Sequence, residues 1–300
     1  MDLKENEIEN IAKLAETSKE EVYKYSELYK GKFIVIKYGG HAMGDKLLSL
    51  SFANNIVLLK KLGINPVVIH GGGPQIGAML DKLKIKSSFI DGLRVTSEEI
   101  VDIVEMVLAG SINKEIVAKI NSSSGLAVGI SGKDANLILA KKFLKNKKDP
   151  NSNIEKVLDI GFVGEPVKIN ISIINTLSSA GFIPIISPIG FGANGETFNI
   201  NADTAAGAIA GSLHADRIIL LTDVPGVLND KKKLINSLSK KEIHKMIKTG
   251  VITGGMIPKI TTCLDSLQSG VQAAVIIDGR VSNAILKEIL TDKGYGTLIS

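Results

Sequence analysis

The sequence predicts an α/β fold, a three-layer α/β/α sandwich around a mostly parallel sheet. Two short apolar runs, at residues 33–40 and 67–74, each end abruptly in glycines and are each followed by a helix-like segment. Further strands and amphipathic helices alternate along the chain, which is typical of a parallel sheet with helices on both faces. Because the two glycine transitions fit one βαβ unit, both glycine loops are expected at the same edge of the sheet.

The segment before the first strand is predicted to be helical. Ile8, Ile11 and Leu14 form an apolar stripe, and Ser18 with Glu21 has the spacing of a capping box. Gly31 suits the end of this helical region. An amphipathic helix outside the βα pattern must bury its stripe against its own domain or against another subunit, and both alternatives remain open.

In the first half of the chain, apolar spacing and turn residues predict the following elements. Strands are expected at residues 33–36, 67–70, 126–130, 136–140 and 157–163. Helices are expected at 45–62, 74–83, 111–120 and 171–180. A further helix should open with a capping box at Thr96 and Glu99 and break near Gly110. Loops are expected at 91–94 and 141–153, and Gly164, Glu165 and Pro166 should end the strand before them.

The second half continues the alternation of strands and helices. Strands are expected at residues 182–186, 217–221, 275–277 and 296–299. Helices are expected at 204–213, 240–248, from 256 onward and at 283–290. Residues 187–196 are predicted to form a long glycine-rich loop. We divide the chain into a helical extension at 1–30, an N-terminal lobe at 31–181 and a C-terminal lobe at 182–300.

Composition excludes several classes of protein. The net charge is +5, but there is no tryptophan and only 4% aromatic content, so nucleic-acid binding is not indicated. No apolar run reaches the roughly 18 residues that a membrane helix needs, and the N-terminus lacks the pattern of a signal peptide. Cys263 is the one cysteine, which favours a reducing compartment. We expect a cytoplasmic protein, or one of the plastid stroma if its gene is organelle-encoded.

The glycine loops indicate an enzyme that handles phosphate. Lys37 stands where the first strand stops, and Gly39 and Gly40 allow backbone amides to approach an anion closely. No Gly-Lys-Ser/Thr follows the glycines, so this is not a Walker A loop, and a G-x-G-x-x-G pattern is also absent. The absence of G-x-G-x-x-G argues against a dehydrogenase.

Six motifs occur in the order IKYGGHAM, VIHGGGPQI, DGLRVT, NINADTAA, LLTDVPGVL and TGGMIPK. Together they closely resemble the acetylglutamate kinases of the amino acid kinase family. The resemblance extends over nearly all of residues 31–300 and implies the α/β/α fold of that family. It also implies that the N-terminal lobe binds N-acetyl-L-glutamate and that the C-terminal lobe binds ATP. The implied reaction passes the γ-phosphoryl group to the γ-carboxylate, a step in arginine biosynthesis.

The resemblance implies roles for individual residues. Lys37 and Lys259 match the two cations that stabilise the transferring phosphoryl group, and Asp203 matches the acidic residue that orients them. An anionic carboxylate must attack an anionic phosphate, so charge neutralisation and in-line positioning dominate such a reaction. Mg²⁺ is expected to be bound mainly through the phosphates, so no direct protein ligand is named.

The resemblance also implies the binding residues. Gly72 and Gly73 match backbone donors to the substrate and the migrating phosphoryl group, and Arg94 matches the arginine that pairs with the α-carboxylate. Asn199 matches a substrate-binding asparagine. Six residues match the adenosine-side loops of the family, namely Thr222, Asp223, Val224, Gly226, Ile252 and Thr253.

Regulation by arginine is a further implication of the resemblance. Arginine-inhibited members are allosteric hexamers, trimers of dimers interlaced through an N-terminal helix, and residues 18–31 match that helix. Tyr25, Glu288 and Gly294 match positions of the effector site. Three residues depart from the pattern of that group: Lys24 replaces a usual proline, and Val275 and Asn283 replace usual histidines. A signalling protein of the PII type is a further partner that the resemblance suggests.

Two alternatives remain at the level of sequence. The first is another amino acid kinase, with aspartate, glutamate or carbamate as substrate, although DGLRVT and NINADTAA favour the acetylated substrate. The second is a non-catalytic sensor of arginine or nitrogen that retains the fold. The presence of Lys37, Asp203 and Lys259 together argues against the second alternative.

Overall fold

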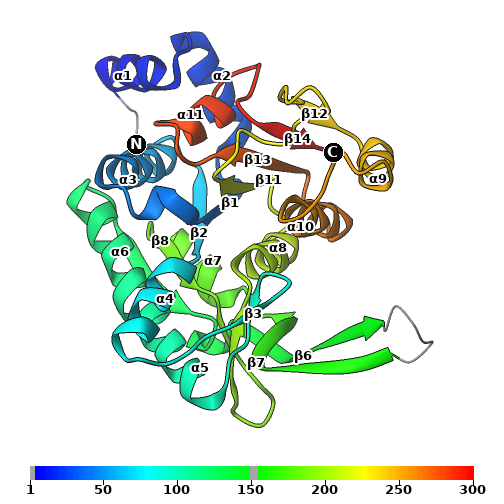
Figure 1. The fold of residues 1–300 in the computed structure, drawn as a ribbon. Coiled ribbons are helices and arrows are strands. Elements are labelled where there is room, and N and C mark those ends of the chain that lie inside the picture. The colour runs from blue at the N-terminus through cyan, green and yellow to red at the C-terminus, as the bar shows by residue number, and fades with distance from the viewer. Residues whose placement is uncertain (1–3, 149–154) are drawn as a thin grey trace.

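The computed structural model describes residues 4–148 and 155–300. Its centre is an eight-stranded sheet in the order β12-β14-β13-β11-β1-β2-β8-β5 (Figure 1). Neighbouring strands are parallel except for β13 and β14. The strands are β1 Phe33–Tyr38, β2 Asn65–His70, β5 Ala127–Ser131, β8 Ile183–Ser187, β11 Arg217–Thr222, β12 Ser237–Leu238, β13 Ala273–Asp278 and β14 Thr297–Ile299. The predicted mostly parallel sheet is therefore confirmed.

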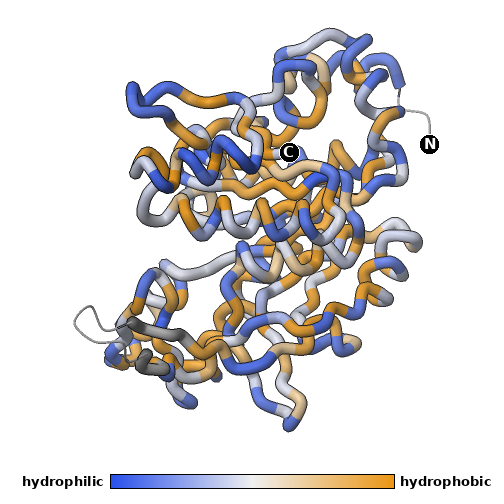
Figure 2. The backbone as a smooth tube through the Cα atoms, turned by 90° about the vertical axis from the view of Figure 1, so that its right-hand side faces the viewer, coloured by the Kyte–Doolittle hydropathy of each residue, from blue (hydrophilic) through white to orange (hydrophobic). Residues whose placement is uncertain are grey.

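Helices cover both faces of this sheet because successive strand residues point to opposite sides. Ile34 and Ile36 of β1 pack with the helices of one face, whereas Val35 packs with those of the other face. The first layer contains α1 Glu5–Ala15, α2 Lys19–Tyr29, α3 Lys46–Lys61, α4 Gly73–Lys82, α5 Glu98–Glu105, α6 Asn113–Ser122 and α11 Ala284–Ile289. The second layer contains α7 Ser172–Ser179, α8 Ala202–Ser212, α9 Lys240–Lys248 and α10 Met256–Gln268. In Figure 2 the central strands run through the interior as mainly hydrophobic segments.

The predicted βαβ unit is present. Strands β1 and β2 are parallel neighbours, and Tyr38 at the end of β1 pairs with His70 at the end of β2. The amide of Gly71 donates to the carbonyl of Tyr38 over 2.8 Å, so the two glycine loops begin side by side. Asp45 caps α3 between the two strands by accepting from the amide of Leu48. Both glycine loops therefore lie at the carboxyl edge of the sheet.

Four other strands form a small closed ring beside the main sheet. They are β6 Ile138–Lys148, β7 Glu155–Ile169, β9 Ile189–Phe191 and β10 Thr197–Ile200. The predicted loop at 141–153 is wrong for residues 141–148, which extend β6 against β7, and residues 149–153 lie outside the described part of the chain. Figure 1 shows these two strands as a long arm projecting from the body. The sequence of residues 141–148 is rich in lysine and lacks the hydrophobic alternation that marks a strand.

Glycines within the ring caused two further wrong predictions. Gly164 and Pro166 do not end the strand, because β7 continues to Ile169 with irregular register opposite Leu139 and Ala140. Residues 187–196 are not one loop, because β9 lies within them and pairs with β10. A Cβ at Gly164 would lie 2.5 Å from Phe198, and one at Gly190 would lie 2.6 Å from Ile200. Close packing between strands, and not a turn, therefore explains both glycines.

Residues 89–122 differ from the prediction in three respects. Ser97, and not Thr96, is the N-cap, and it accepts from the amide of Ile100. No break occurs near Gly110, since α5 continues through the π-helix η2, Met106–Ile112, directly into α6. Before this helix, Arg94 lies in a short hairpin, β3 Phe89–Ile90 with β4 Leu93–Arg94, where a loop was predicted.

The two N-terminal helices pack on their own chain. Ile8 and Ile11 of α1 and Val22 of α2 are buried in the same hydrophobic cluster as β1 and α3. Ser18 caps α2 as predicted, but Glu21 does not complete the capping box, because its carboxylate accepts from Thr17 and from the amide of Asp292. Gly31 ends the region with a φ of 74°, as its position predicted.

The main sheet is continuous across the predicted lobes. Strand β8 follows the boundary at residue 182 yet pairs with β2 and β5, which precede it. The division into lobes stays a prediction. Within the described part of the chain, none of the helices has the length and hydropathy needed to cross a membrane.

Candidate active site

Three side chains from distant parts of the sequence converge at the carboxyl edge of the sheet. The Nζ atom of Lys37 lies 3.1 Å from Oδ1 of Asp203, and the Nζ atom of Lys259 lies 2.8 Å from Oδ2 of the same carboxylate. These side chains are 12%, 12% and 18% exposed for Lys37, Asp203 and Lys259, so the cluster is shielded from bulk water but still accessible. The two ammonium groups therefore point to one carboxylate.

Backbone structure explains how each of these residues is held. Lys37 lies in β1, one residue before the strand ends, and Lys259 lies in the first turn of α10. Asp203 lies in the first turn of α8, whose N-cap is Asn201. The Asn201 side-chain oxygen accepts from the amides of Asp203 and Thr204 over 2.9 and 3.2 Å. This cap fixes the start of α8 and with it the carboxylate.

The environment of Asp203 favours its ionised form. Burial alone would raise its pKa, but the nearby charges of Lys37 and Lys259 more than offset that effect, so the pKa lies below its ordinary value. The cluster therefore contains two ammonium groups and one carboxylate. Its net positive charge suits it to attract a phosphate group.

A cavity of about 210 Å³ opens beside the cluster. Predicted site residues line it from both glycine loops and from later elements, namely Lys37, Gly72, Gly73, Arg94 and Asn199. Apolar side chains complete its wall, among them Ile76, Leu93, Leu108, Val163 and Ile200. The volume and the mixed lining suit a small polar molecule with a short apolar part.

Arg94 is held in place before any ligand arrives. It is 7% exposed, donates to the carbonyl of Gly73 over 3.0 Å and to the hydroxyl of Ser87, and its guanidinium lies 4.5 Å from the ring of Phe89. Burial lowers its pKa from the ordinary value, although a guanidinium remains charged in proteins. A fixed guanidinium in a cavity wall can pair with a carboxylate through two parallel hydrogen bonds.

The other predicted substrate residues lie on rigid elements. Asn199 is in β10 and donates to the hydroxyl of Thr96 over 3.4 Å. Gly72 is the N-cap of α4 and Gly73 its first residue. A side chain at Gly72 would collide with Ile112 and Leu108 of the π-helix, whereas the space beside Gly73 is open. Gly72 is thus required by packing, independently of any ligand.

The predicted nucleotide residues lie outside this cavity but at the same sheet edge. Thr222 ends β11, and a Cβ at Gly40 would lie 2.7 Å from the carboxylate of Asp223, so the first glycine loop touches this segment. Val224 is exposed, and Gly226 packs against Thr297. Ile252 is buried in the core and Thr253 is exposed three residues before α10, the helix of Lys259.

The residue set fits an anionic phosphate group. Beside the two lysines, Gly39 has no Cβ, and one there would lie 3.0 Å from the Lys37 ammonium group. The N-termini of α4 and α10, near Gly73 and Lys259, favour anions as well. Among the described residues, no group of three or more His, Cys, Asp or Glu side chains could hold a metal ion. Both oxygens of Asp203 lie against ammonium groups, so this carboxylate is not available as a metal ligand.

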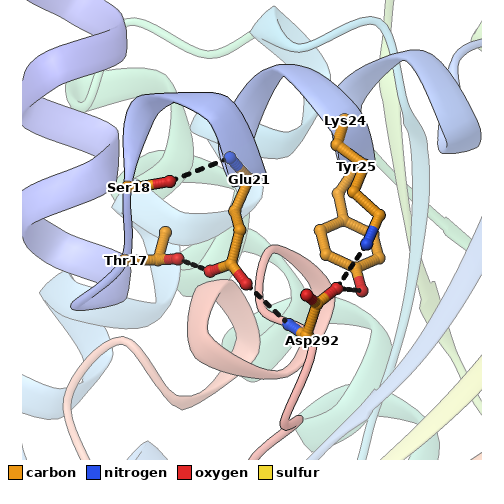
Figure 3. A network of polar contacts seen from close by, with 6 residues as sticks. All are labelled: Thr17, Ser18, Glu21, Lys24, Tyr25 and Asp292. Atoms are coloured by element: carbon orange, nitrogen blue, oxygen red, sulfur yellow. Dashed lines mark hydrogen bonds and ion pairs between the residues drawn. The ribbon is translucent and has the colours of Figure 1, made fainter.

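The predicted effector residues lie in α2, which contains Tyr25, and in the C-terminal segment that contacts it. The hydroxyl of Tyr25 and the ammonium group of Lys24 both contact the carboxylate of Asp292, and the amide of Asp292 donates to Glu21 over 3.4 Å (Figure 3). Lys24, which departs from the family pattern, therefore forms an ion pair with the C-terminal segment.

Glu288 and Gly294 lie together in that segment. The Glu288 carboxylate accepts from the amides of Tyr295 and Gly296 over 2.6 and 3.2 Å, and Gly294, at a φ of 62°, lies against it. Burial raises the pKa of Glu288, while those two amides and the charge of Arg217 oppose the rise. The structure brings Glu288 and Gly294 together and places Tyr25 on the neighbouring Asp292.

The role of Asn201 and one contact of His70 escaped the sequence interpretation. Asn201 lies within NINADTAA, and an Asn two residues before a helical Asp is a recognisable N-cap signal. The contact of His70 with Asn113 has no local signal, because 43 positions separate the two residues in the sequence.

Comparison with known proteins places the chain among kinases that act on small metabolites. A family model described as the amino acid kinase family matches residues 32–278. The chain is 58% identical over 279 residues to an acetylglutamate kinase of Rhodospirillum centenum, covering 93% of this chain and 92% of that protein. It is also 58% identical over 271 residues to an acetylglutamate kinase of Gluconobacter oxydans, covering 90% and 92%.

Solved structures agree with the fold. An N-acetylglutamate synthase of Neisseria gonorrhoeae, complexed with coenzyme A and N-acetyl-glutamate, superposes with a TM-score of 0.80 at 24% identity. The match covers 94% of this chain and 62% of the synthase. A carbamate kinase of Giardia lamblia bound to AMP-PNP superposes with a TM-score of 0.63 at 18% identity, covering 90% of this chain and 98% of that one.

Proposed function

The chain belongs to the amino acid kinase family, and we propose that it transfers the γ-phosphoryl group of ATP to the γ-carboxylate of N-acetyl-L-glutamate. The products are N-acetyl-L-glutamyl 5-phosphate and ADP, and the reaction is a step on the route to arginine. The observation that supports this most directly is the Lys37–Asp203–Lys259 cluster beside a glycine-lined cavity. Identity of 58% to acetylglutamate kinases supports the choice of substrate within the family.

The cluster supplies the electrostatics that this transfer requires. Negative charge accumulates on the oxygens around the migrating phosphorus, and Lys37 and Lys259 neutralise it from two elements of the fold. Asp203 spaces and orients the two ammonium groups. No general base is needed, because the attacking carboxylate is already ionised at neutral pH. Mg²⁺ bound to the phosphates would add further charge neutralisation.

The cavity supplies the positioning. Arg94 pairs with the α-carboxylate of the substrate, and Asn199 supports the amide end. The amides of Gly72 and Gly73 hold the γ-carboxylate toward the lysines. Apolar wall residues such as Leu93 and Val163 suit the methylene groups and the acetyl methyl of the substrate.

A substrate panel tests the assignment. ADP release is measured by a coupled assay with N-acetyl-L-glutamate, L-glutamate, L-aspartate and carbamate at equal concentrations. We expect kcat/KM for the acetylated substrate to exceed that for each of the others by about 100-fold or more, since groups built to recognise one substrate are left unpaired by the others. A higher kcat/KM for one of the other three would show that this compound is the substrate. Lack of turnover with every one of the four would favour the sensor alternative.

Substitution of Lys37 tests the mechanism. We expect Lys37→Ala to lower kcat by about 100- to 1,000-fold, the cost typical of removing one stabilising group from a transition state, while circular dichroism remains unchanged. Lys32→Ala is the matched control, since Lys32 precedes the same strand, is exposed, and pairs with Asp216 at the long distance of 3.5 Å. Its turnover should stay near that of the parent protein. If Lys37→Ala turned over as fast as the control variant, Lys37 would have no role in the mechanism.

We also propose that arginine inhibits the enzyme and that it assembles as a trimer of dimers through its N-terminal helices. The juxtaposition of Glu288 and Gly294 with the segment that contacts Tyr25 supports a binding place for a cationic amino acid there. Activity measured against rising L-arginine, and size-exclusion chromatography with and without residues 1–30, test the two parts separately. An intact protein that elutes only as a dimer would refute the hexamer.

A further inference from the structure

His70 ends strand β2 immediately before the three glycines of the second loop, and no role in the proposed reaction has been assigned to it above. Its side chain is fully buried, and it does not line the cavity that the following glycines line. One ring nitrogen, Nδ1, lies 2.9 Å from the carbonyl oxygen of Gly71. The other, Nε2, lies 3.3 Å from the side-chain nitrogen of Asn113. Both ring nitrogens therefore have a protein partner.

The orientation of the Asn113 amide is set by other contacts. Its nitrogen lies 2.9 Å from the carbonyl of Ile185 and 3.3 Å from that of Ile130, while its oxygen accepts from the ammonium group of Lys114 over 3.2 Å. An amide turned the other way would place its oxygen against two carbonyls and its NH₂ against an ammonium group. The two N–H groups of Asn113 face three acceptors, namely the two carbonyls and Nε2, so one N–H is shared between two of them. Because Nε2 faces an NH₂ group, it must accept.

These contacts select one tautomer of His70. Nε2 accepts from Asn113, and Nδ1 faces a carbonyl that can only accept, so the proton lies on Nδ1. Burial lowers the pKa of this histidine to about 4, which keeps the ring neutral at physiological pH. His70 therefore donates one hydrogen bond, and its acceptor is the carbonyl of Gly71.

That hydrogen bond fixes the peptide between Gly71 and Gly72. The amide of Gly71 is already held by the carbonyl of Tyr38 over 2.8 Å. In a trans peptide the carbonyl and the following N–H point in opposite directions. With the Gly71 carbonyl directed at buried His70, the N–H of Gly72 is directed away from that ring, and Gly72 itself lines the cavity. Within the described part of the chain, that N–H has no recorded acceptor.

We propose that His70, oriented by Asn113, is a positioning residue that aims the amide of Gly72 at the reacting carboxylate and phosphoryl group. The inference rests on the proposed function, in which that amide is a donor to the substrate. His70 touches no reacting atom and exchanges no proton during the reaction. Its contribution is preorganisation, because a donor already aimed at the transition state needs no reorganisation when charge develops.

The tautomer is tested first, without substrate. The chain has four histidines, so ¹⁵N-histidine labelling gives few ring signals, and the signals of His70 are those missing from a His70→Asn sample. We expect a protonated Nδ1 and an unprotonated Nε2 at pH 7.5. Protonation at Nε2, or at both nitrogens, would overturn the proposal. This measurement is independent of activity, so it distinguishes failure of the inference from failure of the proposed function.

A matched pair of amide variants tests the effect on turnover. In His70→Asn the side-chain nitrogen can occupy the place of Nδ1, whereas in His70→Gln it reaches the place of Nε2 and faces the Asn113 donor. We expect His70→Gln to lower kcat about tenfold, with KM for ATP changed less than about twofold, and His70→Asn to recover most of the loss. Equal kcat in the two variants, both folded by thermal melting, would overturn the proposal. Should either variant fail to fold, the tautomer of the parent protein still decides.

Discussion

At the scale of single residues, the site depends on one carboxylate shared by two lysines. Asp203 lies within 3.1 Å of both ammonium groups, which come from positions 37 and 259 of the sequence. Two ammonium groups this close would repel one another strongly in a partly dry site if no anion lay between them. The carboxylate therefore makes the arrangement stable when no phosphate is bound, and a phosphate entering the site meets lysines already in position.

We predict that Asp203→Asn weakens both catalysis and stability. Loss of the carboxylate leaves two poorly hydrated ammonium groups unpaired, and breaking such a pair costs about 3 kcal/mol of unfolding free energy. Turnover should fall about 100-fold, since the lysines lose their fixed spacing. Urea unfolding at pH 7.5 and the coupled assay measure the two effects. Unchanged unfolding free energy would show that Asp203 does not hold the cluster.

An exposed ion pair provides the control for that experiment. Asp159 pairs with Lys142 in the β6–β7 arm, where both side chains are well exposed, so Asp159→Asn should leave the unfolding free energy nearly unchanged.

The sign of the pH dependence provides a second check. The folded-state pKa of Asp203 lies below its ordinary value, so its stabilising contribution is complete above about pH 4 and is lost as the pH falls through the folded-state pKa. In Asp203→Asn, the unfolding free energy should therefore no longer show the decrease at acid pH that protonation of Asp203 causes.

Sequence reasoning succeeded for residues whose role lies in a local pattern and failed for those held by distant partners. Lys37 before two glycines and Asp203 in the first turn of a helix are visible in the sequence, and the structure brings them together. The contact of His70 with Asn113 and the ion pair of Lys24 with Asp292 depend on which elements pack side by side. Such contacts have no local signal, so they could not be predicted without the fold.

At the scale of elements, the π-helix η2 shapes the second glycine loop. Its residues Leu108 and Ile112 pack where a side chain at Gly72 would lie, with 2.4 Å between a Cβ at Gly72 and Cδ1 of Ile112. A π-turn shifts the residues that follow it relative to a regular α-helix, and such segments often occur at functional sites. The same segment leads directly to Asn113, the partner of His70. The π-helix thus supports the glycine loop through both contacts.

We predict that Gly72→Ala lowers the unfolding free energy by about 1–3 kcal/mol through overpacking against this segment. Ile112→Val removes the nearest atom, so the double variant should be more stable than the sum of the two single effects by about 0.5 kcal/mol or more. Gly73→Ala is the control, because nothing lies within 4 Å of a Cβ there, and its stability should remain close to that of the parent protein. If the effects of the two substitutions were additive, Gly72 would not be coupled to the π-helix through packing.

Three of the wrong element predictions share one physical cause. Gly164 and Gly190 were interpreted as turn residues, but in this fold they let neighbouring strands of the small ring approach closely. Gly110 was expected to break a helix that instead continues as a π-helix. The sequence shows where a glycine is. It does not show whether the fold requires the backbone freedom of that glycine, as in a turn, or its lack of a side chain, as between closely packed strands. The main strands were predictable because they are buried runs of β-branched residues.

At the scale of the whole molecule, the sheet separates two hydrophobic cores, and the N-terminal helices belong to one of them. Ile8, Ile11 and Ala15 of α1 are buried with residues of β1, α3 and α11. The ion pair of Lys287 with Glu16 and the contacts of Asp292 join these helices to the C-terminal segment. Residues 4–30 therefore pack within their own chain, which already buries their apolar stripe.

We predict that Ile11→Ala lowers the unfolding free energy by about 2–5 kcal/mol, as expected for a fully buried isoleucine. Lys13→Ala, two positions away on the exposed side of α1, should change it by less than about 0.5 kcal/mol. The first variant truncates a buried side chain and the second an exposed one, and thermal and urea unfolding compare them at several protein concentrations. If the difference in unfolding free energy between the two variants persists at every protein concentration, Ile11 packs against its own chain. If the effect of Ile11→Ala vanished on dilution to the smallest oligomer, α1 would be stabilised by a second subunit instead.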